Sequence, residues 1–115
     1  MNIENGLLSG SWSLLVLKTL EKEDMYGYQI IENLAIKSDD TFSLKAGTLY
    51  PLLKTLEQQG VLNSYEKIAD NKRKRIYYSI TPKGQNALQQ KQDEWSYFTA
   101  KVNELLNGGQ ECGVF

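Results

Sequence analysis

The chain has 115 residues and a formal net charge of −1 at pH 7, and 41% of its residues are hydrophobic, as expected for one globular domain. It has no histidine and a single cysteine, Cys112, so we expect no metal site, no cofactor and no histidine-based catalysis. No apolar run approaches the roughly 20 residues that cross a bilayer, and the N-terminus lacks a basic leader. The sequence therefore predicts a cytoplasmic protein that is not an enzyme and makes no membrane contact.

Two short helices are expected in the first part of the chain. Ser11 or Ser13 can cap the first helix, which runs to about Lys22 and repeats leucine at helical spacing. Asp24 is the expected N-cap of the second helix, whose apolar positions continue to Leu34. The polar segment KSDDTFS then predicts a connecting loop.

The stretch GTLYPLLKTLEQQG, residues 47–60, predicts a third helix that Ser43 caps and Gly60 ends. One side of this helix is expected to be buried, because it carries four leucines at helical spacing: Leu49, Leu52, Leu53 and Leu56. The other side carries hydroxyl, amide, aromatic and basic groups: Lys45, Thr48, Tyr50, Lys54, Thr55 and Gln58. Pro51 lies within the helix, where it either bends the axis or is tolerated as local strain.

After Gly60 the period of the apolar residues changes from 3.6 to 2. The segments VLNSYEKI and RIYYSI predict two strands, and the polar joint ADNKRKR between them predicts a hairpin with a basic tip. Thr81 followed by Pro82 is a strong start signal for a fourth helix, which we expect to run to about Asn107.

The order helix, helix, helix, hairpin, helix predicts a mainly α fold with a small β-hairpin, that is, an α+β winged helix-turn-helix with a C-terminal dimerisation helix. In such a fold the third helix enters the major groove of DNA, and the hairpin, or wing, reaches the flanking backbone. We expect residues 1–81 to form the winged-helix DNA-binding domain, residues 82–107 the dimerisation helix and residues 108–115 a flexible tail.

The charge is unevenly distributed along the chain. Residues 43–83 carry eight basic and three acidic residues, a net charge of +5, whereas the remainder has a net charge of −6. A basic segment of this kind attracts polyanions. The candidate DNA-binding residues are Lys45, Thr48, Tyr50 and Lys54 on the third helix and Lys72, Arg73, Lys74 and Arg75 on the hairpin. The same surfaces could instead form a protein–protein interaction module without sequence-specific DNA binding.

Three segments, MYGYQIIENL, GTLYPLLKTLEQQGVL and KRKRIYYSITPKG, resemble in their order and spacing the PadR family of bacterial transcriptional regulators. The resemblance covers residues 7 to 107, and TLYPLL is its most family-specific part. It implies a homodimeric winged-helix repressor that binds a palindromic operator in double-stranded DNA and releases it when a small molecule binds. The single C-terminal helix is similar to that of the family's small branch, which includes multidrug-sensing repressors. Whether this chain represses or activates transcription is left open by its sequence.

Apolar residues of the fourth helix recur at intervals of seven and predict a short coiled-coil seam. The expected dimer-interface residues are Leu88, Trp95, Phe98, Val102 and Leu105, and Lys91 is a polar position in the same seam. On so small a domain, such a stripe would leave a large apolar patch exposed unless another surface buries it. A second copy of the chain would supply one, and packing on the chain's own domain is the alternative.

In the drug-sensing branch of the family, a tryptophan at the position of Trp95 lines a pocket at the dimer centre, where two indoles can stack on a flat aromatic ligand. The resemblance therefore implies a small aromatic or phenolic effector that contacts Trp95. Thr99 lies one turn further along the helix, and Leu14 and Lys18 of the first helix could face the same pocket. Trp12 and Lys18 could also fill or charge it.

Overall fold

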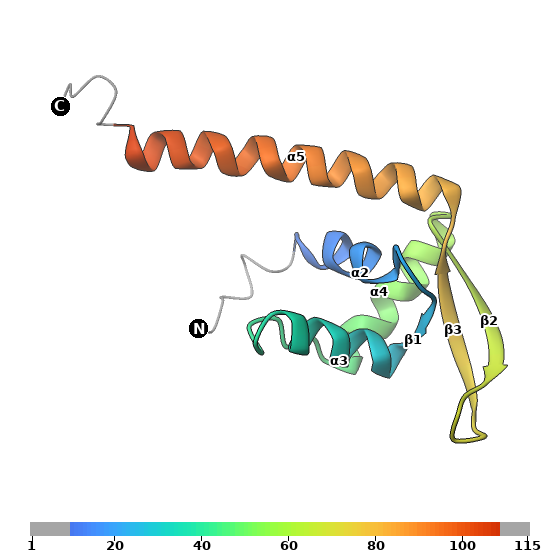
Figure 1. Ribbon diagram of the computed structural model, residues 1–115. Coiled ribbons are helices and arrows are strands. Elements are labelled where there is room, and N and C mark those ends of the chain that lie inside the picture. Colours follow the sequence, from blue (N-terminus) through green and yellow to red (C-terminus); the bar gives the residue numbers. More distant parts are fainter. Residues whose placement is uncertain (1–9, 109–115) are drawn as a thin grey trace.

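The structure is a computed structural model and describes residues 10–108. Its elements are, in chain order, α2 (Trp12–Leu20), β1 (Met25–Tyr26), α3 (Gly27–Lys37), α4 (Ala46–Gln58), β2 (Leu62–Ile68), β3 (Lys74–Ile80) and α5 (Pro82–Asn107), as Figure 1 shows. The predicted α+β winged-helix order is confirmed, and β1 is an additional element. Cys112 and the expected tail, apart from Gly108, lie outside the described residues.

Two of the predicted helix starts differ from the structure in detail. Helix α2 begins after Ser11, whose side chain makes no capping hydrogen bond, and Ser13 lies inside the helix. Helix α2 also ends at Leu20, before the predicted end. Helix α4 begins after Lys45, so the prediction that Ser43 caps it is wrong. Ser11 thus stands at the N-cap position of α2, where its carbonyl accepts a hydrogen bond from the Leu15 N–H at 3.0 Å, whereas Ser43 lies outside α4.

The start of α3 also differs, and here the cause is a strand. Met25 and Tyr26 pair antiparallel with β3, which holds them extended, so α3 begins only after Tyr26 and the prediction of Asp24 as its N-cap is wrong. The backbone N–H of Tyr26 donates to Oε1 of Gln29 at 3.1 Å, closing a capping box. Asp24 has another role, because its carboxylate accepts a hydrogen bond of 2.5 Å from the Tyr65 hydroxyl.

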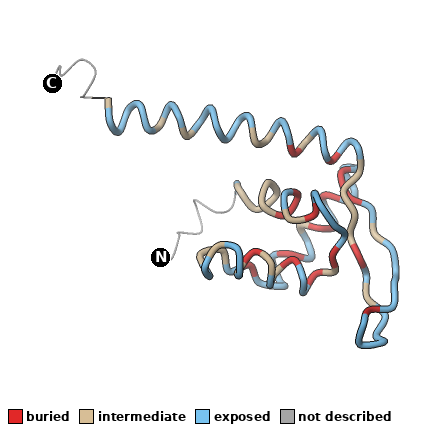
Figure 2. Tube along the Cα trace, in the orientation of Figure 1, coloured by how far each residue is buried: buried red, intermediate tan, exposed pale blue. Residues whose placement is uncertain are grey.

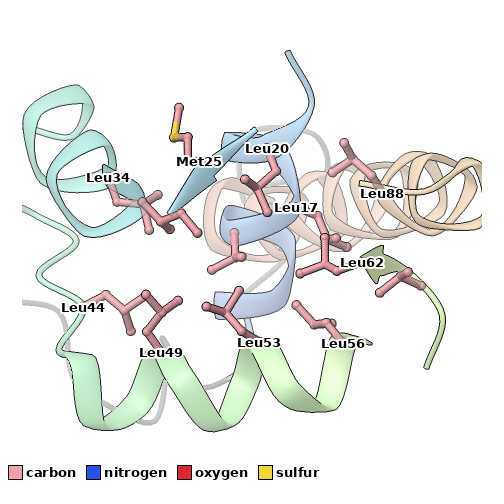
Figure 3. Close-up of a cluster of buried hydrophobic side chains, with 13 residues drawn as sticks. Leu17, Leu20, Met25, Leu34, Leu44, Leu49, Leu53, Leu56, Leu62 and Leu88 are labelled. Carbon is pink, nitrogen blue, oxygen red and sulfur yellow. The ribbon is translucent and has the colours of Figure 1, made fainter. Parts of the chain in front are cut away.

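The hydrophobic core lies where α2, α3, α4 and the near end of α5 meet (Figures 2 and 3). Leu49, Leu53 and Leu56 are the buried residues of α4, as its leucine repeat predicts, and Leu52 is half-buried. The three buried leucines form one cluster with residues from the rest of the domain: Val16, Leu17, Leu20, Met25, Ile30, Leu34, Leu44, Val61, Leu62 and Leu88. The leucine side of α4 thus faces inward, and its polar side faces solvent.

The chain reverses at Gly60, between α4 and β2. Gly60 has a positive φ of 79°, as predicted for the left-handed residue that follows a helix. The Val61 N–H donates to the Leu56 carbonyl at 3.1 Å, and the Gly60 N–H donates to the Glu57 carbonyl at 3.0 Å. These two bonds form a Schellman motif, which directs β2 back along the domain. The hairpin that follows completes an antiparallel sheet with the strand order β1-β3-β2.

Thr81 joins the end of the hairpin to the ends of two helices. Its Oγ1 accepts a hydrogen bond from the Gly84 N–H at 2.9 Å, which caps α5 as predicted. The same hydroxyl donates to the Gly60 carbonyl at 2.7 Å, and the Thr81 N–H donates to the Val61 carbonyl at 3.1 Å. The start of α5 is therefore fixed to the turn that ends α4.

Helix α5 has 26 residues and is about 39 Å long at 1.5 Å per residue. Leu88, in its second turn, is only 1% exposed and packs in the domain's own core. Beyond it the helix extends past the other elements (Figure 1), and the molecule measures 63 × 30 × 21 Å. Within residues 10–108, no helix is both long and apolar enough to cross a membrane.

We expect Gly84→Ala to destabilise the fold by about 1–3 kcal/mol, because an added methyl group would overlap the Val61 carbonyl oxygen and lie 2.7 Å from Cγ1 of Ile80. The matched control is Gly47→Ala in α4, where the added carbon meets no atom within 4 Å outside the adjoining helix backbone. Urea unfolding of both variants measures the difference. If Gly84→Ala were as stable as the wild type, that result would contradict the tight junction described above.

Candidate nucleic-acid interface

The outward side of α4 carries the groups that the sequence predicts to contact bases and phosphates. Lys45, Thr48 and Lys54 are all exposed, because the leucine side of the helix is buried. The Thr55 hydroxyl donates to the Pro51 carbonyl at 3.1 Å. Pro51 is itself exposed, and α4 continues through it without a break. A helix that presents hydroxyls and cations in this way has the side chains of a groove-reading helix.

Tyr50 is more constrained than its neighbours on α4. Its side chain is 46% exposed, and its ring lies against Gly27 at the start of α3, where a Cβ would overlap the tyrosine hydroxyl. Gly27 is therefore required for the close approach of α3 and α4 at this point. Nearly half of the Tyr50 side chain thus stays exposed, while its contact with Gly27 restrains the direction of the ring.

Helix α4 is attached to the sheet through a cluster of polar side chains. The Ser64 hydroxyl of β2 donates to Oε2 of Glu57 at 2.6 Å. Burial raises the pKa of Tyr78 on β3, and the nearby Glu57 carboxylate and Tyr50 raise it further. These contacts hold the wing in a fixed position beside α4.

The four basic residues of the hairpin occupy different environments. The Ala69 N–H donates to the Arg73 carbonyl and the Lys72 N–H to the Ala69 carbonyl, both at 2.8 Å. Asn71 Oδ1 accepts from the Arg73 N–H at 3.1 Å. The loop is thus a three-residue turn in which Lys72 takes a left-handed conformation with φ 65°. Lys72 and Arg73 lie at the tip, whereas Lys74 and Arg75 belong to β3.

Successive residues of a strand point to opposite faces of a sheet, so Lys74 and Arg75 diverge. Lys74 Nζ lies 3.9 Å from Oε2 of Glu66, and both side chains are well exposed; such a pair adds little stability. The Arg75 guanidinium lies over the Tyr26 ring, with Cζ 5.1 Å from the ring centroid. The four consecutive cations of the hairpin are therefore two residues at the tip and two on opposite faces of β3.

The predicted seam residues of α5 differ in exposure and fall into three groups. Leu88 is buried in its own domain, so it offers no surface to a partner, and its placement in a dimer interface is wrong. Val102 is half-buried. The other three seam residues are exposed by 48% at Trp95, 59% at Phe98 and 84% at Leu105.

Only two of the four predicted effector residues come together. A shallow hollow of about 230 Å³ lies between the start of α2 and the middle of α5, lined by Ser11, Leu14, Lys91, Glu94, Trp95 and Phe98. The Thr99 hydroxyl is directed to its own helix, where it donates to the Trp95 carbonyl at 2.9 Å. Lys18 lines a different, larger cavity of about 540 Å³ between α2 and α3, and its Nζ bonds Glu21 at 2.7 Å.

The order of three helices, a hairpin and a further helix, with a polar face on the third helix beside a basic hairpin, defines a winged-helix DNA-binding protein. The chain belongs to the transcriptional regulator PadR-like family, whose pattern matches residues 16–90. It is therefore a PadR-like transcriptional regulator.

Solved structures of similar proteins agree with this assignment. A transcriptional regulator from Clostridium thermocellum is 34% identical, with a TM-score of 0.80 over 87% of this chain and 97% of its own. A PadR family regulator from Eggerthella lenta is also 34% identical, with a TM-score of 0.77 over 88% and 86% of the two chains. A PadR-like regulator from Bacillus cereus is 30% identical, with a TM-score of 0.78 over 89% and 97%. An uncharacterised protein of Lysinibacillus sphaericus is 28% identical over 91% of this chain and 93% of its own.

We expect Lys72→Gly to raise the free energy of unfolding by roughly 0.5–1 kcal/mol, because glycine adopts a positive φ without the steric cost that lysine incurs. The same change should weaken DNA binding, since a tip cation is lost. Lys72→Ala is the control: it removes the charge and keeps the strain, so it should weaken binding without stabilising the fold. Equal stability of the two variants in urea would show that the turn is not strained at this residue.

Proposed function

We propose that this regulator is a repressor that binds a palindromic operator as a homodimer and is released from it by a small aromatic or phenolic effector. The observation that carries the proposal is the apolar stripe on the part of α5 beyond Leu88. Trp95, Phe98, Val102 and Leu105 recur at alternating steps of three and four residues, the spacing of a coiled-coil seam. Trp95, Phe98 and Leu105 keep about half or more of their side-chain surface exposed.

A second copy of the chain is the simplest partner that would bury this stripe. Isolated surface leucines are common, but a contiguous row of large apolar side chains on one helix face marks an interaction surface. Two copies related by a twofold axis would pair the same stripe with itself. Their two α4 helices would then face successive major grooves, about 34–36 Å apart, which matches a palindromic site.

The hollow beside Trp95 supports a ligand-responsive dimer. At about 230 Å³ it is smaller than most small-molecule sites, which enclose roughly 300–1,000 Å³. Two such hollows facing each other across a dimer axis would make a cavity of suitable size. Leu14 and Phe98 supply apolar walls, and Trp95 supplies an aromatic face on which a flat ligand can stack.

Release of DNA then follows from a shift between two dimer geometries. An effector that fits one geometry better raises its population, and the two α4 helices no longer match successive grooves. By linkage, operator DNA weakens effector binding by the same factor. Because the hydrogen bonds of Thr81 fix α5 to the end of α4, a change in the angle between two α5 helices would be transmitted to the two recognition helices.

The dimer is tested by Phe98→Glu, which places a charge in the middle of the proposed seam. We expect this variant to be monomeric at micromolar concentration in sedimentation equilibrium. We also expect it to lose at least about 100-fold in affinity for an operator that the dimer binds through both half-sites, a difference of about 2.8 kcal/mol. Tyr97→Glu is the matched control, because Tyr97 is 68% exposed and lies off the seam. A Phe98→Glu variant that remains dimeric would contradict the proposal.

The effector site is tested by tryptophan fluorescence. We expect planar aromatic compounds, a hydroxycinnamate among them, to quench the emission of the wild type, because Trp95 lines the hollow whereas the ring of Trp12 packs edge-on against Phe42 at 6.3 Å. Trp95→Ala should abolish the quenching and leave the emission of Trp12. If a compound that releases the operator quenches both proteins equally, Trp95 does not contact the effector.

DNA from the region upstream of the chain's own coding sequence is the natural first probe for the operator. A mobility-shift titration against salt separates DNA recognition from a protein–protein contact. A complex held by phosphate contacts weakens steeply as salt rises, whereas an apolar protein contact is nearly indifferent to it. The genes beside the coding sequence would indicate what is regulated and by which class of effector.

A further inference from the structure

The face of the sheet turned away from the helices carries a row of three tyrosines. Met25, Leu62, Tyr78 and Ile80 pack on the core, so the alternate residues of each strand lie on the outer face. There Tyr77 of β3 stands directly opposite Tyr26 of β1 on one side and Tyr65 of β2 on the other.

The three rings are in contact. Tyr77 packs edge-on against Tyr26 with ring centroids 5.4 Å apart, and stacks with Tyr65 at 5.8 Å and an interplanar angle of 17°. Tyr77 is only 8% exposed as a result. The rings therefore form a rigid aromatic row across the wing.

Two cations lie on this row. Lys67 of β2 and Arg75 of β3 are directly opposite each other in the ladder, an arrangement that is unfavourable for like charges. Lys67 Nζ lies 5.1 Å from the centroid of the Tyr77 ring, and Cζ of Arg75 lies 5.1 Å from that of the Tyr26 ring. Ring faces stabilise cations without neutralising them.

The acidic side chains near this row do not form ion pairs with its two cations. Across the described part of the chain, no carboxylate forms an ion pair with Lys67 or Arg75. Glu66 points to the opposite face and lies near Lys74. The Asp24 carboxylate accepts a hydrogen bond from the Tyr65 hydroxyl. This bond raises the pKa of Tyr65 to about 12. Within residues 10–108, the outer face of the wing thus carries two cations, Lys67 and Arg75, that no salt bridge pairs.

We infer that the outer face of the wing is a second DNA-phosphate contact, and that Lys67 is a DNA-contacting residue in addition to those on α4 and at the hairpin tip. The inference rests on DNA binding by this regulator. DNA is favoured over an acidic protein because the cations continue toward the tip: Arg73 precedes Arg75 by two residues, a separation of about 6.7 Å along an extended chain. A row of this spacing can follow phosphates along one DNA strand.

The test uses Lys67→Gln in the full-length chain, with Lys67→Arg as the charge-retaining variant and Lys22→Gln as the control for charge elsewhere, since Lys22 is exposed in the loop after α2. The probe is a fluorescein-labelled duplex of arbitrary sequence, about two helical turns long. Its affinity is measured by anisotropy between about 50 and about 200 mM salt.

We expect Lys67→Gln to weaken binding about five- to tenfold and to lower the slope of log affinity against log salt by about 1. Lys67→Arg and Lys22→Gln should match the wild type, and circular dichroism should show that Lys67→Gln is folded as the wild type is.

If Lys67→Gln binds DNA and responds to salt as the wild type does while Arg73→Gln binds more weakly, the outer face is not a DNA contact and only the hairpin tip is. If the wild type binds no duplex at all, the proposed function itself fails. An unchanged DNA affinity with loss of an acidic protein partner would assign the face to a protein instead.

Discussion

Burial of the leucine side of α4 is the contact on which the other features of this protein depend. Each leucine removed from water there contributes about 1.5–3 kcal/mol, and Leu49, Leu53 and Leu56 are all at most 3% exposed. Because these side chains fix the rotation of the helix, its polar side must face solvent. The same core holds α2 and α3 behind α4, and Gly27 allows α3 to approach closely enough to support Tyr50. The outward positions of the polar side chains on α4 therefore follow from hydrophobic packing on the other side of the helix.

A second constraint joins this helix to the wing and to α5. The hydrogen bonds of Thr81 connect the first turn of α5 to the turn at Gly60, and the Ser64–Glu57 bond connects β2 to α4. Helix α4, the wing and the base of α5 are thereby fixed to one another within a few residues. Beyond the hollow that it forms with α2, helix α5 leaves the domain, and its apolar stripe is exposed at Trp95, Phe98 and Leu105. Under the proposed function, this arrangement lets one rigid unit carry a DNA-facing side and a partner-facing side.

Most of the fold could be predicted from the sequence because its signals are local. The leucine period of α4, the glycine after it, the change to a period of two and the pair Thr81–Pro82 each act within a few residues. The start of α3 could not be predicted, because Met25 and Tyr26 are extended only through pairing with a strand some 50 residues further along the chain. Leu88 was wrongly assigned to the dimer interface for a related reason. The heptad repeat runs through both the part of α5 that packs on its own domain and the part that extends beyond it, so the repeat alone cannot show where one part ends. Likewise, Lys67 could be placed opposite Arg75 only once the length of the hairpin turn was known.

The central claim is that the outward side of α4 and the β2–β3 wing form one DNA-binding surface, with the partner-facing stripe on a separate part of α5. Hydrogen–deuterium exchange of the full-length protein, with and without saturating operator duplex, tests this most directly. We predict added protection in α4 and in the hairpin, and no change in exchange along α3 (Gly27–Lys37). Protection confined to α3 or to the end of α5, with α4 and the hairpin unchanged, would contradict the account.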